Sequence, residues 1–462
     1  MRALLFMFFA FSYFLAAAQA DKEDFYHWLY ESDAKVPIVH MDIVDSLLPA
    51  DKLTYLDAVI SIEGNGVIPS IQDVPVLIKG RGNSSWKNKA NAKNPSRLKF
   101  PKKQNLMGER KGKNWVLLAN SRRGSMLTNA IGLYIAHLLK IPFANHVVPV
   151  ELYMNGNYWG SYNLTEKVGV SNNSINLRDE SRAALLEIDS YFDAEYKFVS
   201  QPYQLPVNIK YPDFQTDSTS ITADDIQADF TLFLSQLVLH NDISSYVDNE
   251  TLAKFFLLEE LTDNAEMWKP RSMYVFKAAV GDDSSKYQFA PVWDFDWAFG
   301  VNKNGQRFFE GSPHHDFWDR SFSLSNEFWI DLRFLNPGFQ DIYYKVWTGF
   351  MDSGLSQLLD FCEKYYAFVE PSIRHNSQIR NDSTDYQAQV LQAVAWLDKR
   401  AHDIYGKLSR PGSYWTAFTR TDSVNVYSIQ GVRMLRNIPY RELRHYLQRG
   451  FYVIDGKVKY IY

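Results

Sequence analysis

Two carboxylates lie two residues apart in an aromatic, apolar segment of this chain, residues 290–300. Asp294 and Asp296 follow a predicted strand over residues 287–292. Carboxylates on an apolar surface repel each other and are costly to remove from water unless a cation or a proton neutralises them. Oxygen ligands of this kind suit Mg²⁺ or Mn²⁺, often shared with a phosphorylated ligand. The alternative is a turn in which both aspartates accept backbone hydrogen bonds. The apolar neighbours favour the metal.

A basic block lies well before this segment. From Arg81 to Arg123 the chain carries thirteen Lys or Arg and a single acid, Glu109. Such a block attracts phosphate, nucleic acid or an acidic surface, although any one lysine is more readily an ordinary solvated charge. No nucleic-acid motif accompanies it. We therefore expect a nucleotide, and no nucleic acid, as the anionic partner.

The block opens with the glycine-containing segment 80–86, Gly-Arg-Gly-Asn-Ser-Ser-Trp. Glycine permits backbone conformations that side chains forbid, and the exposed amides of such a loop can bind an anion. The segment lacks the third glycine of GxGxxG and the GK[ST] ending of a P-loop. A tight turn is an equal alternative.

The elements expected to position these residues come from hydrophobic periodicity. Strands are predicted at residues 38–43, 56–63, 74–79, 97–100 and 114–120, and helices at residues 125–140, 225–240, 250–261 and through roughly 340–408. Asn155-Gly156 predicts a hairpin between strands 147–154 and 157–164. Asp248 is the expected N-cap of the helix that follows it. A second hairpin, 271–278 with 287–292, would deliver Asp294.

The two ends of the chain differ from its middle. Residues 1–20 have the basic start, apolar stretch and small-residue cleavage site of a secretory signal peptide, so we expect an exported protein. The single cysteine, Cys362, permits no intrachain disulfide. After the break at residues 411–413, short strands at 424–429, 450–454 and 458–462 predict a small β module.

Six segments in order resemble the CotH family, the spore-coat-type secreted kinases. They are residues 80–86, Arg97-Leu98-Lys99, 113–120 (KNWVLLAN), 152–167 (LYMNGNYWGSYNLTEK), Leu186-Glu187-Ile188-Asp189 and 291–296 (PVWDFD). The resemblance covers residues 38–400. It implies an α+β, atypical two-lobed protein-kinase-like fold, with an N-lobe over about 21–190 and a C-lobe over about 191–408. The small all-β, sandwich-like module would occupy 409–462.

The resemblance also implies a reaction and its cofactors. Family members transfer the γ-phosphate of ATP to proteins with a divalent metal, so ATP, Mg²⁺ or Mn²⁺ and a protein substrate are expected. Asp294 matches the family's metal-binding aspartate, and Asp296 would be a second ligand. Lys99 would contact the nucleotide phosphates and Glu166 would orient it, unless each forms an ordinary surface ion pair. Arg81 and Arg97 would add charge around the phosphates.

One segment departs from the family pattern. The family usually has Asn-x-Asp after the helix that ends near Leu261, with the aspartate as catalytic base, whereas this chain has Asn264-Ala265-Glu266. The Asn expected a few residues later is missing from 267–272. A non-catalytic surface or adhesion protein on the same fold is therefore an alternative. A carbohydrate-active enzyme is a third hypothesis, because Asp-x-Asp also holds the metal of nucleotide sugars.

The C-terminal module looks like the β-sandwich tails of secreted Bacteroidetes proteins. Its matching segments are 426–431 (VYSIQG) and 450–457 (GFYVIDGK). Such tails often act as sorting or surface-attachment domains, which predicts a secreted or cell-surface protein. An ordinary accessory β domain is the alternative.

Overall fold

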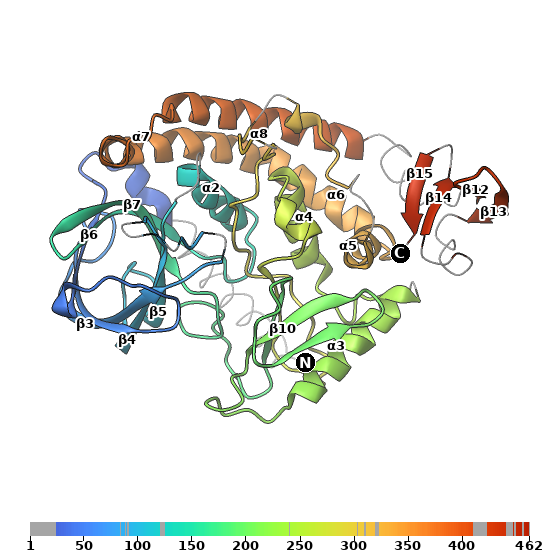
Figure 1. Cartoon of the computed structure of the whole chain (residues 1–462), viewed down its shortest axis with the longest axis horizontal. Coiled ribbons are helices and arrows are strands. Elements are labelled where there is room, and N and C mark those ends of the chain that lie inside the picture. Colours follow the sequence, from blue (N-terminus) through green and yellow to red (C-terminus); the bar gives the residue numbers. More distant parts are fainter. Residues whose placement is uncertain are drawn as a thin grey trace, which may run out of the picture.

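The computed structural model describes residues 25–461 except 84, 88, 90–91, 121–124, 240, 303, 309–310, 319–322, 410–422, 440–446, 448–449 and 455–456. The predicted signal peptide at 1–20 and the chain break at 411–413 lie outside these residues. The fold is mixed α+β (Figure 1). A strand barrel forms one end, long helices lie across the top, and a small sheet forms the opposite end.

Seven strands close the barrel in the order β1-β2-β3-β4-β5-β7-β6. They are β1 (Ile38–Ile43), β2 (Leu56–Glu63), β3 (Ile71–Gly80), β4 (Ser96–Gln104), β5 (Gly112–Leu118), β6 (Val147–Met154) and β7 (Asn157–Glu166). The predicted hairpin between β6 and β7 is confirmed, and its turn residues Asn155 and Gly156 have φ of 50° and 75°. Positive φ at both positions is the reason for Asn-Gly in a two-residue turn.

Alternation along β4 separates two kinds of residue. Leu98 and Phe100 are buried, whereas Arg97 and Lys99 lie on the other face of the strand. Lys79 of β3 stands opposite Arg97, and Asn114 of β5 opposite Lys99. Because paired residues of neighbouring strands share a face, the cations collect on one outer face of the barrel.

A second, four-stranded sheet has the order β11-β8-β10-β9. Its strands are β8 (Ala184–Ile188), β9 (Lys197–Ser200), β10 (Leu205–Tyr211) and β11 (Met273–Lys277). The predicted hairpin between 271–278 and 287–292 is reduced to one antiparallel bridge, in which Phe276 of β11 and Gln288 exchange backbone hydrogen bonds of 3.0 and 2.9 Å. Pro291 has no amide to extend that pairing.

The helices agree with the hydrophobic pattern except for α5, which was not predicted. They are α2 (Ser125–Leu138), α3 (Ala223–Val238), α4 (Asn249–Leu261), α5 (Leu324–Phe334), α6 (Phe339–Gly349), α7 (Leu355–Arg380) and α8 (Tyr386–Leu408). Asp248 caps α4 as predicted, accepting from the Thr251 amide over 2.8 Å. Helix α2 packs against α7, where the rings of Tyr134 and Phe361 stack at 3.7 Å. Helix α2 thus joins the barrel to the helices (Figure 1).

The C-terminal residues form a small sheet with the order β13-β12-β14-β15. Its strands are β12 (Ser423–Ser428), β13 (Arg433–Pro439), β14 (Gly450–Ile454) and β15 (Lys457–Ile461). The sequence pattern missed β13, as it also missed β8, β9 and β10 of the second sheet. A separate small core of Val426, Tyr452 and Ile454 holds the sheet together.

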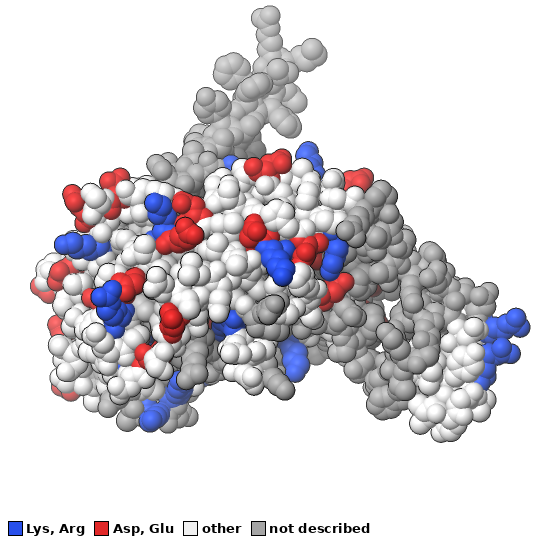
Figure 2. Space-filling view, turned by 90° about the horizontal axis from the view of Figure 1, so that it is seen from above, with Lys and Arg blue, Asp and Glu red and all other residues white. Residues whose placement is uncertain are grey.

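The outer surface over α7 and α8 carries mixed charge. Figure 2 shows acidic and basic side chains interspersed over this face, which fits a formal net charge of −4 for the chain. Within the described residues, no helix has the length and apolar composition needed to span a bilayer.

Candidate functional site

The two carboxylates lie on a buried ledge, as the sequence predicted. Asp294 and Asp296 are half-buried, while Trp293 and Phe295 on either side are 6% and 0% exposed. The Asp296 amide donates to Asp294 Oδ1 over 3.2 Å. Asp294 has φ of 65°, a conformation that costs free energy in a non-glycine residue and concentrates at functional sites. The segment is a strained loop that presents two acids together.

Helix α2 holds this loop from below. The Asn129 side chain accepts from the Phe295 amide over 3.0 Å and donates to Asp296 Oδ1 over 3.2 Å. One turn along the helix, Gly132 faces the Phe295 ring, and a Cβ at this glycine would lie 2.4 Å from the ring. Sequence reasoning missed both residues, because α2 is remote from the loop in the chain.

Asn264 and Glu266 enter from the end of α4. Asn264 is fully buried and begins the short 3₁₀ helix η3 (Ala265–Trp268), accepting from the Glu266 amide over 3.2 Å. Its Nδ2 donates to the Asp294 carbonyl over 3.5 Å. Asn264 therefore positions Glu266 relative to Asp294.

The pKa of Glu266 responds to the neighbouring acids. Burial and then the charge of Asp294 raise the pKa of Glu266 to about 8, with smaller contributions from Asp189 and Asp296. Arg271 opposes this, its Nη1 lying 3.7 Å from Glu266 Oε2. Such a like-charge group is stabilised by a cation.

A divalent ion fits this loop only if a second group, besides Asp294 and Asp296, also supplies ligands to it. No group of three or more His, Cys, Asp or Glu suitable for a metal occurs within the described residues. Asp294 and Asp296 could supply two ligands, and Mg²⁺ commonly takes its remaining ligands from phosphate oxygens and water. The donor set thus requires an anion next to the loop.

Cations for such an anion converge from the barrel. The Arg81 guanidinium lies over the Trp293 ring at 5.5 Å, which brings the end of β3 to the residue before Asp294. Arg97 of β4 donates to Asn114 Oδ1 over 3.1 Å, while its buried Nε has no hydrogen-bond partner in the described structure. Burial lowers the pKa of Arg97, and Arg81 adds to the effect.

Lys167, the residue after β7, completes this group and was missed by sequence reasoning. Burial, followed by the charges of Arg97, Lys210 and Arg81, lowers the pKa of Lys167 to about 7. Glu187 of β8 opposes the shift and pairs with Lys210 over 3.0 Å. We define the cationic cluster as Arg81, Arg97 and Lys167. Arg81 lowers the pKa of Arg97, and both arginines lower the pKa of Lys167, so a polyphosphate bound here would stabilise the charged forms of Arg97 and Lys167.

The expected pair of Lys99 and Glu166 is not formed. Glu166 opposes Trp115 in the β5–β7 ladder, whereas Lys99 opposes the preceding residue, Asn114, so the two side chains point to opposite faces. Glu166 is buried and accepts from the His146 amide over 2.8 Å, with His146 Nδ1 2.6 Å from its other oxygen. Lys99 is exposed and lies 5.9 Å from the Tyr55 ring.

These features define a mixed α+β protein in which a cation at the end of a barrel strand, Arg81, lies next to a loop with paired carboxylates, an arrangement suited to phosphate and metal. The family model described as CotH kinase protein matches residues 78–404, more than two thirds of the chain. The chain therefore belongs to the CotH kinase protein family. No curated protein matches it.

Proposed function

We propose that this protein is a secreted kinase that transfers the γ-phosphate of ATP to protein hydroxyls with Mg²⁺ or Mn²⁺. The observation that carries the proposal is the contact of Arg81 with Trp293, the residue before Asp294, because the charge of Arg81 also acts on Arg97 and Lys167. Arg97 and Lys167 are buried cations whose pKa values are lowered further by neighbouring positive charge, so an anion would stabilise them, and paired carboxylates need a cation. A metal-bound triphosphate would supply the anion for the cationic cluster and the cation for the carboxylates.

Each residue then has a distinct task. Arg97 and Lys167 would bind the phosphates. Arg81 would also bind them, next to the loop of residues 293–296, which we call the metal loop. Asp294 and Asp296 would hold the ion, which supplies charge neutralisation of the phosphates when bound. Glu187, beside Lys167, takes the orienting role that Glu166 cannot. Glu266 would accept the proton of the attacking hydroxyl once a cation offsets the two neighbouring acids that raise its pKa.

Fold and location complete the proposal. The barrel with α2 would correspond to the N-lobe of an atypical protein-kinase-like fold, and the helices around α4, α7 and α8 to its C-lobe. The site lies where the two meet. Export through residues 1–20 and surface attachment through the C-terminal sheet are proposed from the sequence, because the family match ends at residue 404.

The test is nucleotide binding and phosphate transfer by the full chain. ATP with Mn²⁺ should raise the melting temperature more than either alone, and labelled γ-phosphate should pass to the protein itself or to an added protein. Asp294→Ala should reduce transfer at least about 100-fold. Asp283→Ala, which removes an exposed carboxylate outside the site, is the control. Full transfer by Asp294→Ala would refute the assigned role.

A nucleotide-binding protein without transferase activity is the second candidate, and Glu266 favours it. A carboxyl with a pKa of about 8 is largely protonated at neutral pH and is then a poor base. This candidate predicts the same metal-dependent rise in melting temperature with no transfer of label. Glu266→Asp restores the family residue, and a gain of transfer in that variant would indicate that only the base limits the reaction.

A further inference from the structure

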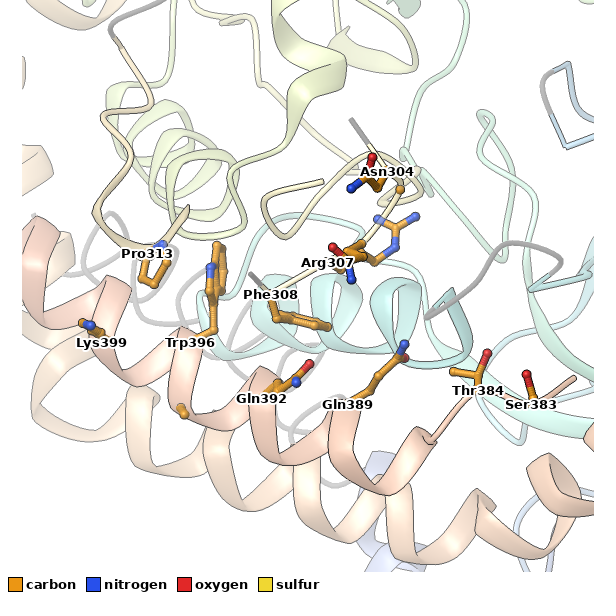
Figure 3. A pocket seen from close by; sticks show the side chains of 13 residues that line it. Asn304, Arg307, Phe308, Pro313, Ser383, Thr384, Gln389, Gln392, Trp396 and Lys399 are labelled. Carbon is orange, nitrogen blue, oxygen red and sulfur yellow. The ribbon is translucent and has the colours of Figure 1, made fainter. Parts of the chain in front are cut away.

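A pocket of about 610 Å³ opens beside the metal loop, between α8 and the chain segment that follows the loop (Figure 3). None of the candidate site residues lines it. Phe308, Pro313 and Trp396 form its buried floor. A volume of this size is in the range of sites that bind small molecules or short chain segments.

One rim of the pocket is a line of polar residues along α8. Gln389, Gln392 and Lys399 lie on the side of the helix that faces the pocket, together with Trp396 (Figure 3). From Gln389 to Lys399 the helix rises about 15 Å. An extended peptide of about four or five residues covers that length.

The opposite rim comes from the segment after the metal loop and carries matching groups. Asn304 and Gln306 are exposed there and line the pocket, and Figure 3 shows Asn304 across the pocket from α8, beyond Arg307 and Phe308. A side-chain amide both donates and accepts hydrogen bonds. Gln306 Oε1 already accepts from Asn302 Nδ2 over 2.9 Å, so Asn304, Gln389 and Gln392 are the side-chain amides that could pair with the amides and carbonyls of an extended backbone.

The charge of the lining narrows the choice of ligand. The lining residues include two cations, Arg307 and Lys399, and no carboxylate. A basic peptide would therefore meet like charge, whereas a neutral or acidic one would not. The aromatic and proline floor suits an apolar or aromatic side chain of that peptide.

The pocket and the metal loop share a wall. Arg307 Nη1 donates to the Ala298 carbonyl over 2.8 Å, and its Nη2 donates to the Asp296 carbonyl. The ring of Phe299 lies 5.2 Å from Phe308 and 6.1 Å from Trp396. A chain segment bound in the pocket is thus held against the same structure that presents Asp296.

We propose that this pocket docks an extended, neutral or acidic segment of the protein substrate, with an aromatic or apolar side chain on the floor of Phe308, Pro313 and Trp396. The proposal rests on the kinase function proposed above, because docking beside the metal loop brings a neighbouring hydroxyl to the site of transfer.

The test uses fluorescent twelve-residue peptides, each with one Phe among Ser and Asn, and with either Glu or Lys at the remaining positions. Binding to the full chain is measured with no nucleotide present. The Glu peptides should bind more tightly than the Lys peptides. Ala395→Tyr, at an exposed position of the lining, should raise the Kd of the Glu peptides at least about tenfold. Leu391→Tyr, on the same helix, 60% exposed and outside the pocket, is the control and should leave it unchanged.

Three outcomes would overturn the proposal: no peptide binding to the unaltered protein, equal binding to Ala395→Tyr, or displacement of peptide by neutral oligosaccharides at lower concentration than by unlabelled peptide. The last would assign the pocket to a glycan. The nucleotide-dependent melting temperature is measured on the same samples. If it shifts with ATP and Mn²⁺ while peptide binding fails, docking is refuted and the nucleotide site stands. If it does not shift, the proposed kinase function fails independently.

Discussion

The side chain of Asn129 holds the carboxylate of Asp296, with Asn129 Nδ2 donating to Asp296 Oδ1 over 3.2 Å. The same side chain accepts from the Phe295 amide, so a single residue of α2 fixes both the backbone and one acid of the metal loop. Helix α2 and the metal loop are therefore held together by the side chain of Asn129. Substitutions on α2 should therefore change the position of the Asp296 carboxylate.

Asn129→Leu keeps the approximate size of the side chain and removes both hydrogen bonds. Because the Phe295 amide is buried and loses its acceptor, we expect a loss of about 1–3 kcal/mol in the free energy of unfolding. We also expect weaker binding of Mn²⁺ with ATP. Urea unfolding and a Mn²⁺ titration of the melting temperature check the two effects. Unchanged Mn²⁺ dependence would contradict the positioning role.

Gly132→Ala should displace Phe295, since the added Cβ would lie 2.4 Å from its ring. Overpacking of this kind costs about 1–3 kcal/mol, and the shift of Phe295 should weaken nucleotide binding with Mn²⁺. Gly406→Ala is the matched control, because this glycine lies within α8 and a Cβ there meets nothing within 4 Å. That control should stabilise the protein by up to about 1 kcal/mol. Equal effects of the two substitutions would refute the steric argument.

The variant Lys167→Met tests two effects of the cationic cluster separately: its effect on the stability of the nucleotide-free protein and its effect on ATP binding. Removing one of several desolvated like charges should leave the stability of the nucleotide-free protein unchanged or raise it by up to about 2 kcal/mol. ATP binding should weaken at least about tenfold, because a phosphate contact is lost. Lys99→Met removes an exposed lysine of the same face and should weaken ATP binding far less. A larger loss in Lys99→Met would restore the role first expected for that residue.

The pH dependence of stability should report buried acids behind the site. Burial raises the pKa of Glu259 to about 8, and one of its oxygens has no hydrogen-bond partner in the described structure. Between its unfolded pKa of about 4 and its folded pKa the folded protein binds more protons than the unfolded chain, so stability falls as pH rises through this window. Glu259→Gln removes this contribution. The variant should gain up to a few kcal/mol over the unaltered protein at pH 8.5 and almost nothing at pH 4.

Urea unfolding from pH 4 to pH 9 measures this difference. Glu266 should give a similar slope that Glu259→Gln leaves in place, since its pKa is also raised to about 8. Parallel curves for the variant and the unaltered protein would show that Glu259 is not neutral in the fold.

Local features of this protein could be predicted from the sequence because their causes are local. Asn155-Gly156 specifies a turn that needs positive φ twice, and Asp248 caps α4 through an amide three residues away. The apolar neighbours of Asp294 and Asp296 indicated a buried ledge, and the ledge is present. These predictions needed only the neighbours of each residue.

Tertiary structure decided which charges meet. Glu166 and Lys167 are adjacent in sequence, yet the strand places them on opposite faces, so Glu166 pairs with His146 inside the barrel and Lys167 lies near Arg97 and Arg81. Residue spacing indicates that neighbours in a strand alternate, but the register of β4, β5 and β7 determines which of them faces the helices. Asn129 and Gly132 reach Phe295 and Asp296 only because α2 packs beneath a loop more than 160 residues away. The carboxylates could be found from composition and pattern, whereas the groups that surround them depend on long-range packing.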